Sequence, residues 1–256
     1  MKIELTVPTK LNEIPLINYQ KFYASQQASN DDEFIMQKMV QCFCGIELKD
    51  VAKIRMTDVV DIVTNLTKTL EEKPKFEPTF KVDNIEFGFV PNLENISFGE
   101  YVDAEAYWDN VEDWHKGMAV LFRPISEKKG DKYQILDYKG SSEFSDAMKY
   151  APMSVVISTR LFFWTIGIDL LTATLNFLAK EMETKELVTL AKELNLENVG
   201  GGMEAYIDSL KGTLQSLTKS RDFHSESALL FSRLQNKAMT YKHENLNEQN
   251  AQDELL

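Results

Sequence analysis

Glu112 and His115 are the two residues whose spacing comes closest to a metal site in this sequence. A Glu-x-x-His pair on a helix places a carboxylate and an imidazole on one face, which is half of a carboxylate-bridged di-metal centre. Such a centre needs the pair twice, but neither His224 nor His243 has an acidic residue three positions before it. We therefore expect no metal and no cofactor here, and interpret the pair as part of a solvated acidic face.

A second chemistry to consider is metal-dependent hydrolysis by clustered carboxylates, since hard oxygen ligands suit magnesium or calcium. The candidates are Asp103, Glu105, Asp109, Glu112 and Asp113. A nuclease built on them would also need basic residues to hold phosphate, and no Lys or Arg occurs between Val82 and His115. A metal-dependent enzyme is thus the least supported alternative, and we expect no catalytic residues.

Cysteine and glycine motifs add no catalytic set. Cys42 and Cys44 have no second cysteine pair, and positions two apart on a helix point in different directions. The run Gly200 to Gly202 lacks the spacing of a phosphate-binding loop, and no Gly-x-Ser-x-Gly occurs. The sequence therefore favours a protein that is not an enzyme.

The segment from Val82 to His115 instead has the composition of a binding surface. It contains nine Asp and Glu residues, and seven aromatic residues lie among them. Large amphipathic rings contribute much contact area at low entropy cost, so they are typical anchors of protein interfaces. We predict partner binding by Phe87, Phe89, Phe98, Tyr101, Tyr107, Trp108 and Trp114, with the acids orienting the partner. Some of these rings must belong to the core, and the sequence does not separate the two groups.

The overall charge narrows the class of partner. The chain has 256 residues, a formal net charge of −12 and a hydrophobic fraction of 43%. This balance disfavours stable nucleic-acid binding, which needs clustered Lys and Arg, and the hydrophobic content is ample for a core. Two cysteines cannot make a disulfide framework, and the start MKIELTVPTK lacks the apolar core of a signal peptide. We expect a protein of a reducing compartment.

Hydrophobic periodicity predicts an α+β fold that is mostly helical. We expect a short strand over residues 3–7, a helical block, and a central hairpin around the turn Asp83-Asn84. The expected helices of the block cover residues 16–28, 32–44, 48–55 and 56–72, with Ser29 or Asn30 and Thr57 as caps. A later helix over residues 111–121 is expected to be closed by Arg123-Pro124, and a further strand covers residues 132–138.

The organisation along the chain follows from changes in composition. We expect an α+β body over residues 1–183 and a charged helix with a glycine-rich hinge over residues 184–202. A helical extension over residues 203–243 and a disordered polar tail over residues 244–256 complete the chain.

One long apolar helix is expected from Val155 to Leu178. It is nearly long enough to span a bilayer, but Arg160 and Asp169 would each be costly near its middle. We favour a helix buried by its neighbours or between copies, so that residues 155–178 would form a homo-oligomer contact. Membrane engagement during infection is the alternative.

Three segments of the chain together resemble a protein family of tailed bacteriophages, especially the crAss-like phages and related viruses of Bacteroidetes. They are MKIELTVPTKLNEIPLINYQKF, NIEFGFVPNLENISFGEYVDAEAYW with HKGMAVLFRP just after it, and APMSVVISTRLFFWTIGIDLL, and the resemblance covers roughly residues 1–180. The plan of strand, helical block and hairpin is also similar to phage tail and baseplate assembly chaperones.

The resemblance implies a virion or assembly role without catalytic residues. A virion or tail component, a cargo protein and a tail assembly chaperone all fit it. It also implies other phage structural proteins as partners and the host cytoplasm as the site of assembly. Whether the protein stays in the virion is left open by the resemblance.

Overall fold

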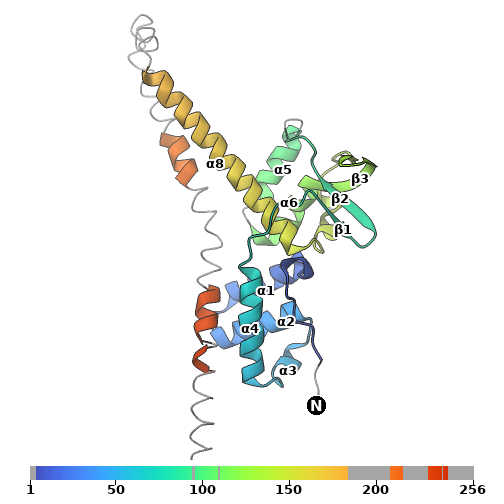
Figure 1. The fold of residues 1–256 in the computed structure, drawn as a ribbon, viewed down its shortest axis with the longest axis vertical. Coiled ribbons are helices and arrows are strands. Elements are labelled where there is room, and N and C mark those ends of the chain that lie inside the picture. The colour runs from blue at the N-terminus through green and yellow to red at the C-terminus, as the bar shows by residue number, and fades with distance from the viewer. Residues whose placement is uncertain are drawn as a thin grey trace, which may run out of the picture. The chain divides into compact units, whose positions relative to one another are not determined.

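The computed structural model describes residues 4–93, 96–108, 110–183, 208–215, 230–237 and 239–241. The chain divides into two compact units, one formed by residues 1–159 with 228–256 and the other by residues 160–227. The expected fold class is confirmed, because helices dominate and a four-stranded antiparallel sheet is present (Figure 1). The sheet and the candidate site both belong to the first unit.

The N-terminal part of the first unit is a helical block (Figure 1). Its elements are η1 (Leu11–Glu13), α1 (Leu16–Ala28), α2 (Asp32–Cys44), α3 (Leu48–Val51) and α4 (Met56–Leu70). The Asp31 side chain caps α2 by accepting hydrogen bonds from the backbone of Glu33 and Phe34, and α2 ends at the left-handed Gly45. The core stripe of α4 is Val59, Val63, Leu66 and Leu70, which are all buried.

Helix caps in this block differ from those expected. Asp31, rather than Ser29 or Asn30, caps α2, and Ser29 instead accepts a hydrogen bond from the Asp31 backbone. Thr57 does not cap α4, because the helix already begins at Met56. A carboxylate next to the first turn also interacts favourably with the helix dipole, which explains why Asp31 takes the capping position.

The sheet consists of four antiparallel strands in the order β1-β2-β3-β4. Their bounds are β1 (Thr79–Val82), β2 (Ile85–Phe89), β3 (Phe122–Lys129) and β4 (Lys132–Ile135). The expected hairpin is confirmed, with Asp83 in the left-handed region at φ 52°. The sequence analysis missed β3, because Arg123 and Pro124 were interpreted as the end of a helix. They lie instead in the strand, opposite Gly88 and Phe87.

Short helices connect β2 to β3 and follow β4. They are α5 (Phe98–Trp108), η3 (Val111–Asp113), α6 (Trp114–Leu121), η4 (Ser141–Glu143) and α7 (Ser145–Met148). Helix α6 is buried over most of its length and continues directly into β3. Packing of α5 against α6 therefore places α5 next to the sheet.

The expected N-terminal strand is not formed over residues 4–9, which have no regular secondary structure, and residues 1–3 lie outside the described part of the chain. Backbone pairing occurs further on, where Leu16 N–H donates to Ala151 O and Met153 N–H donates to Ile14 O. An alternating run of five residues does not make a strand unless a neighbouring backbone is available to pair with it.

The long helix is α8 (Met153–Glu183), and among its described side chains only those at its start are buried. Residues 153–159 are buried, whereas several later positions, Asp169 among them, are exposed. None of the helices in the described ranges is sufficiently long and apolar to cross a membrane. The structure does not support the long apolar helix expected over residues 155–178, because exposed positions recur after Thr159.

The remaining expectations on organisation concern the last third of the chain. Residues 208–215, 230–237 and 239–241 are helical, within the expected extension. The predicted hinge at residues 184–202 and the predicted tail at residues 244–256 lie outside the described residues. Of the proposed oligomer contact at 155–178, the first five residues belong to the protein's own core.

Candidate protein-binding surface on helix α5

The structure separates the seven candidate aromatic residues into three groups. Phe87, Phe89 and Trp114 are buried in the core. Tyr107 and Trp108 are half-buried on the inner side of α5. Phe98 is 83% exposed and Tyr101 is 55% exposed. Of the seven, only Phe98 and Tyr101 expose more than half of their surface.

Phe98 and Tyr101 form an apolar face on α5 together with Val102, which is 44% exposed. The three residues have spacings of three and four, so they lie on one side of the helix. Large exposed apolar residues elsewhere in the described ranges are scattered: Ile85, Leu136, Tyr150 and Met239. We call the group Phe98, Tyr101 and Val102 the α5 outer face.

The first turn of α5 is fixed by Glu100, which points inward. The Ser97 backbone N–H donates to one carboxylate oxygen of Glu100 at 2.8 Å, and the Glu100 N–H donates to Ser97 Oγ at 3.2 Å, which is a capping box. The other carboxylate oxygen of Glu100 accepts a hydrogen bond from Arg123 of β3. The side chains of this ion pair are 8% and 7% exposed, so α5 is joined to the sheet by a buried charge pair.

The environment keeps Glu100 charged. Burial alone would raise the pKa of its carboxyl group, but the hydrogen bonds from Ser97 and Arg123 bring the pKa below its ordinary value. The Arg123 guanidinium also lies 5.6 Å from the centre of the Tyr138 ring. The Tyr138 hydroxyl donates to Asp103 on the next turn of α5. Burial raises the pKa of Tyr138, and the Asp103 carboxylate raises it further. The inner face of α5 is thus held by polar contacts.

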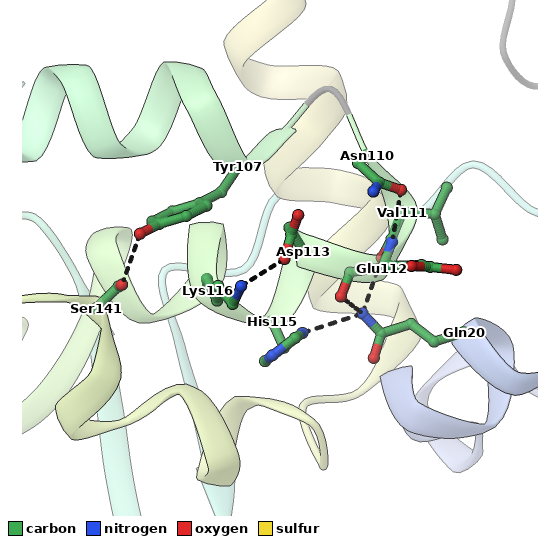
Figure 2. A network of polar contacts seen from close by, with 9 residues as sticks. All are labelled: Gln20, Tyr107, Asn110, Val111, Glu112, Asp113, His115, Lys116 and Ser141. Carbon is green, nitrogen blue, oxygen red and sulfur yellow. Dashed lines mark hydrogen bonds and ion pairs between the residues drawn. The ribbon is translucent and has the colours of Figure 1, made fainter.

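The C-terminal end of α5 is held by its aromatic residues. The Ser141 hydroxyl donates to the Tyr107 hydroxyl at 3.2 Å (Figure 2), and Lys116 Nζ lies 5.5 Å from the centre of the Tyr107 ring. The Trp108 ring packs on Gly117 of α6, where a Cβ atom would come within 3.0 Å of it. Both half-buried rings therefore serve the attachment of α5 to the body.

Gln20 of α1 occupies the space next to the Glu-x-x-His pair (Figure 2). Its amide nitrogen donates to the main-chain oxygens of Val111 and Glu112, at 2.8 and 3.0 Å, and lies 3.2 Å from His115 Nδ1. The amide group has two N–H hydrogens, and the two carbonyl oxygens can take both, so the role of His115 Nδ1 in the 3.2 Å contact is set by the tautomer of the ring.

The surroundings of His115 disfavour the charged form of its imidazole. Burial lowers the pKa of the imidazole, and the nearby Lys149 and Lys116 lower it further. Among the residues that the structure describes, no three His, Cys, Asp or Glu side chains converge on a metal position. The pair therefore acts as a structural joint between α1 and α6.

Four of the nine acids of the 82–115 segment have partners within the protein, which differs from the expected solvated surface. Glu86 pairs with Lys128 and Asp113 with Lys116, in addition to the contacts of Glu100 and Asp103. The basic residues come from outside the segment or from its end, so the segment's own sequence did not show them. The acids position elements of the fold, and fewer remain to orient a partner than expected.

The two cysteines are free and half-buried on α2. Burial raises the pKa of the Cys44 thiol to about 11 and also raises that of Cys42. A thiol with a raised pKa is a poor nucleophile at neutral pH. Both residues act as small members of the helix packing.

A search of protein-family models, curated proteins and solved structures finds no significant match to this chain.

The orientation of α5 was the part of the site that the sequence analysis missed. The spacing of Phe98, Tyr101 and Val102 is visible in the sequence, as is the spacing of Glu100, Asp103 and Tyr107 on the opposite side. Ordinary amphipathic reasoning places the apolar group inside. The capping pattern Ser97-x-x-Glu100 was the one local signal, and it fixes where the helix starts but not which face turns inward.

Proposed function

We propose that this protein is a non-enzymatic binding protein whose α5 outer face docks onto another protein. The observation that carries the proposal is the inverted polarity of the first two turns of α5. Its inner side holds the charged Glu100 and Asp103, while Phe98, Tyr101 and Val102 are exposed. A helix on a free surface normally shows the opposite arrangement.

Physical costs support a binding role for this arrangement. Desolvating Glu100 and Arg123 is expensive, and an apolar pair of similar shape is often at least as stable in such a position. Leaving a phenylalanine 83% exposed forgoes roughly 1.5–3 kcal/mol of burial. Both costs are offset when a partner covers the outer face, because aromatic residues are frequent anchors of interfaces.

The resemblance to a family of tailed phages supplies the biological setting of the proposal. We propose a role in phage morphogenesis, as a virion or tail component, a cargo protein or a tail assembly chaperone. Its partners are then other phage structural proteins, met in the host cytoplasm during assembly. The α5 outer face is small, so it suits one helix or loop of such a partner.

Affinity purification from infected cells tests the proposal. We compare the wild-type chain with F98S/Y101S and with the control Y150S, which removes an aromatic residue that is 59% exposed and lies outside α5. We expect a phage structural protein to copurify with the wild type and Y150S but not with F98S/Y101S. Equal recovery of partners by all three chains would contradict the α5 assignment.

Mass spectrometry of purified virions and of infected-cell lysate then separates the roles. Abundant copies in virions support a structural or cargo component, and copies found only in lysate support a chaperone. Absence of any complex with phage proteins in both samples would contradict the morphogenesis role.

A further inference from the structure

The second unit, residues 160–227, lacks an enclosed core among the side chains that the structure describes. Its described helices are the part of α8 that follows Thr159 and the helix over residues 208–215 (Figure 1). No described side chain of either helix is buried, although α8 carries large apolar residues there. These residues are half-buried: Leu161, Phe162, Phe163, Ile168, Leu171 and Leu175. Because such side chains are normally covered by neighbouring elements, a further surface is needed to complete this core.

The apolar residues of α8 follow a heptad repeat, with positions a to g. Six consecutive a and d positions are apolar: Leu161, Trp164, Ile168, Leu171, Leu175 and Leu178. Their spacings alternate between three and four residues, which is the period of a coiled-coil seam. The exposed residues of this part of the helix all fall at other heptad positions: Thr165, Asp169, Thr172, Ala173 and Asn176. The period and the exposure therefore indicate the same side of α8 as a contact surface for another helix.

The repeat is complementary to itself when two copies of α8 run antiparallel. In an antiparallel coiled coil, an a residue of one helix packs against a d residue of the other. Centring the contact between residues 168 and 171 gives layers that each join two large apolar residues. The layers pair Ile168 with Leu171, Trp164 with Leu175, and Leu161 with Leu178 of the second copy. The same surface serves both copies, as a two-fold symmetric interface requires.

Charges at the edge of the seam favour the antiparallel arrangement. Arg160 and Glu181 both occupy heptad position g. In the antiparallel pair the g positions of the two helices lie side by side, so Arg160 of each copy faces Glu181 of the other. Within one helix these two residues are about 32 Å apart along the axis and cannot pair. In a parallel pair, Arg160 would face the uncharged Thr165 instead.

We propose that residues 160–181 form a homodimer contact, in which the a and d side of α8 packs antiparallel on the same side of α8 in a second copy. The half-buried side of α8 is wider than this seam, since Phe163 at position c and Thr174 at position g also belong to it. The helix over residues 208–215, with Leu210 and Leu214 half-buried, supplies a further apolar surface from each chain. Two copies then bring together four helices around one core, as in a helix bundle.

Substitution of the central layer tests the seam. We compare the wild-type chain with I168K/L171K and with the control A173K/N176K, which places the same two charges at the same spacing on exposed positions. Size-exclusion chromatography with light scattering should show a dimer for the wild type and the control, and a monomer for I168K/L171K. The lysines would otherwise be buried opposite each other at the centre of the seam. A monomeric wild type, or a dimer that survives I168K/L171K, would overturn the proposal.

Charge reversal gives a second test that leaves the apolar seam intact. R160E alone and E181R alone place like charges opposite each other at both ends of the dimer. An equimolar mixture of the two chains restores opposite charges at both ends, and so does R160E/E181R in one chain. We expect each single variant to dimerise roughly tenfold more weakly than the wild type in sedimentation velocity.

The mixture, with one chain fluorescently labelled, should form a heterodimer with nearly the affinity of the wild type, and R160E/E181R should recover it as well. A mixture that associates no better than the single variants would overturn the antiparallel register, and so would single variants with unchanged affinity.

The other occupants of this face give different results. A monomeric wild type whose α8 amides are protected from hydrogen exchange would assign the face to the chain's own residues. A monomeric wild type that floats with phosphatidylcholine vesicles would assign it to lipid, and either result overturns the dimer. No residue of α5 takes part, so F98S/Y101S should remain dimeric, and failure of the α5 assignment would leave this proposal standing.

Discussion

Arg123 of β3 and Glu100 of α5 are 23 residues apart in the sequence and form a buried ion pair that ties the helix to the sheet. The pair lies on the side of α5 opposite the outer face, and the hydrogen bond from Tyr138 to Asp103 acts on the same side of the helix. Together these two contacts hold the polar side of the first two turns of α5 against the body.

Removing one partner of this pair should destabilise the protein strongly. We expect R123M to lower the free energy of unfolding by about 3–5 kcal/mol, because the Glu100 carboxylate is left buried without its cation. The double variant E100Q/R123M should recover a large part of that loss, since no buried charge remains. Urea unfolding of the wild type, both single variants and the double variant measures the coupling. Additive effects would show that the two side chains do not interact.

Substitutions of the aromatic residues should separate core from surface. We expect F87A to cost about 3–5 kcal/mol, because Phe87 is fully buried against other rings. F98A should change the free energy of unfolding by less than about 0.5 kcal/mol, as is usual for exposed positions. Thermal and urea unfolding provide the comparison. A large loss of stability in F98A would mean that the ring is covered in the folded monomer.

Two glycines of the same region should respond in opposite directions to alanine. At Gly88 a Cβ would come within 2.5 Å of the Tyr133 ring, and the Tyr133 hydroxyl is fixed by a 2.9 Å hydrogen bond to Phe89 O. We expect G88A to cost about 1–3 kcal/mol through this overlap. At Gly99 in α5 a Cβ meets nothing within 4 Å, so G99A should gain about 0.5–1 kcal/mol of helix stability. Equal effects of the two substitutions in urea unfolding would contradict the packing of the Tyr133 ring of β4 over Gly88 of β2.

His115 should make stability depend on pH near neutrality. Its pKa in the folded protein lies below the ordinary value, chiefly through burial, so the unfolded chain binds the proton more readily. The contribution of His115 to the free energy of unfolding is then fully present above about pH 6.5, and it is lost as the pH falls through the pKa of the folded state. We expect the wild type to lose more stability than H115Q between pH 7.5 and 5.5. Parallel loss in both chains would show that other groups carry the dependence.

Local patterns in the sequence were sufficient for much of the fold. The bounds of α1 and α2 and the hairpin of β1 and β2 match the expectations, because their periodicity and turn residues agree with each other. Strand β3 was missed because α6 runs into it without a turn residue, and Pro124 was interpreted as a stop signal. The alternation of the N-terminal run also misled, since residues 4–9 adopt no regular secondary structure.

The candidate site was less accessible to sequence reasoning. Which of the seven aromatic residues are exposed depends on Arg123, Tyr138 and Ser141, which lie beyond the acidic segment and meet α5 only in the folded unit. Glu86 of β2 pairs with Lys128 of β3, and Asp113 pairs with Lys116 one helical turn away. A long-range contact that inverts a helix leaves no local trace in the sequence.

The polar inner face of α5 has a consequence for how the native state opens. Detaching the first two turns of α5 would expose mainly Glu100, Arg123 and Asp103, which carry little apolar area. The sensitivity of an opening to denaturant scales with the surface that it exposes, so amides of this part of α5 should exchange by a fluctuation that urea hardly promotes. Amides of α4, whose stripe is wholly apolar, should exchange only through openings with a steep urea dependence.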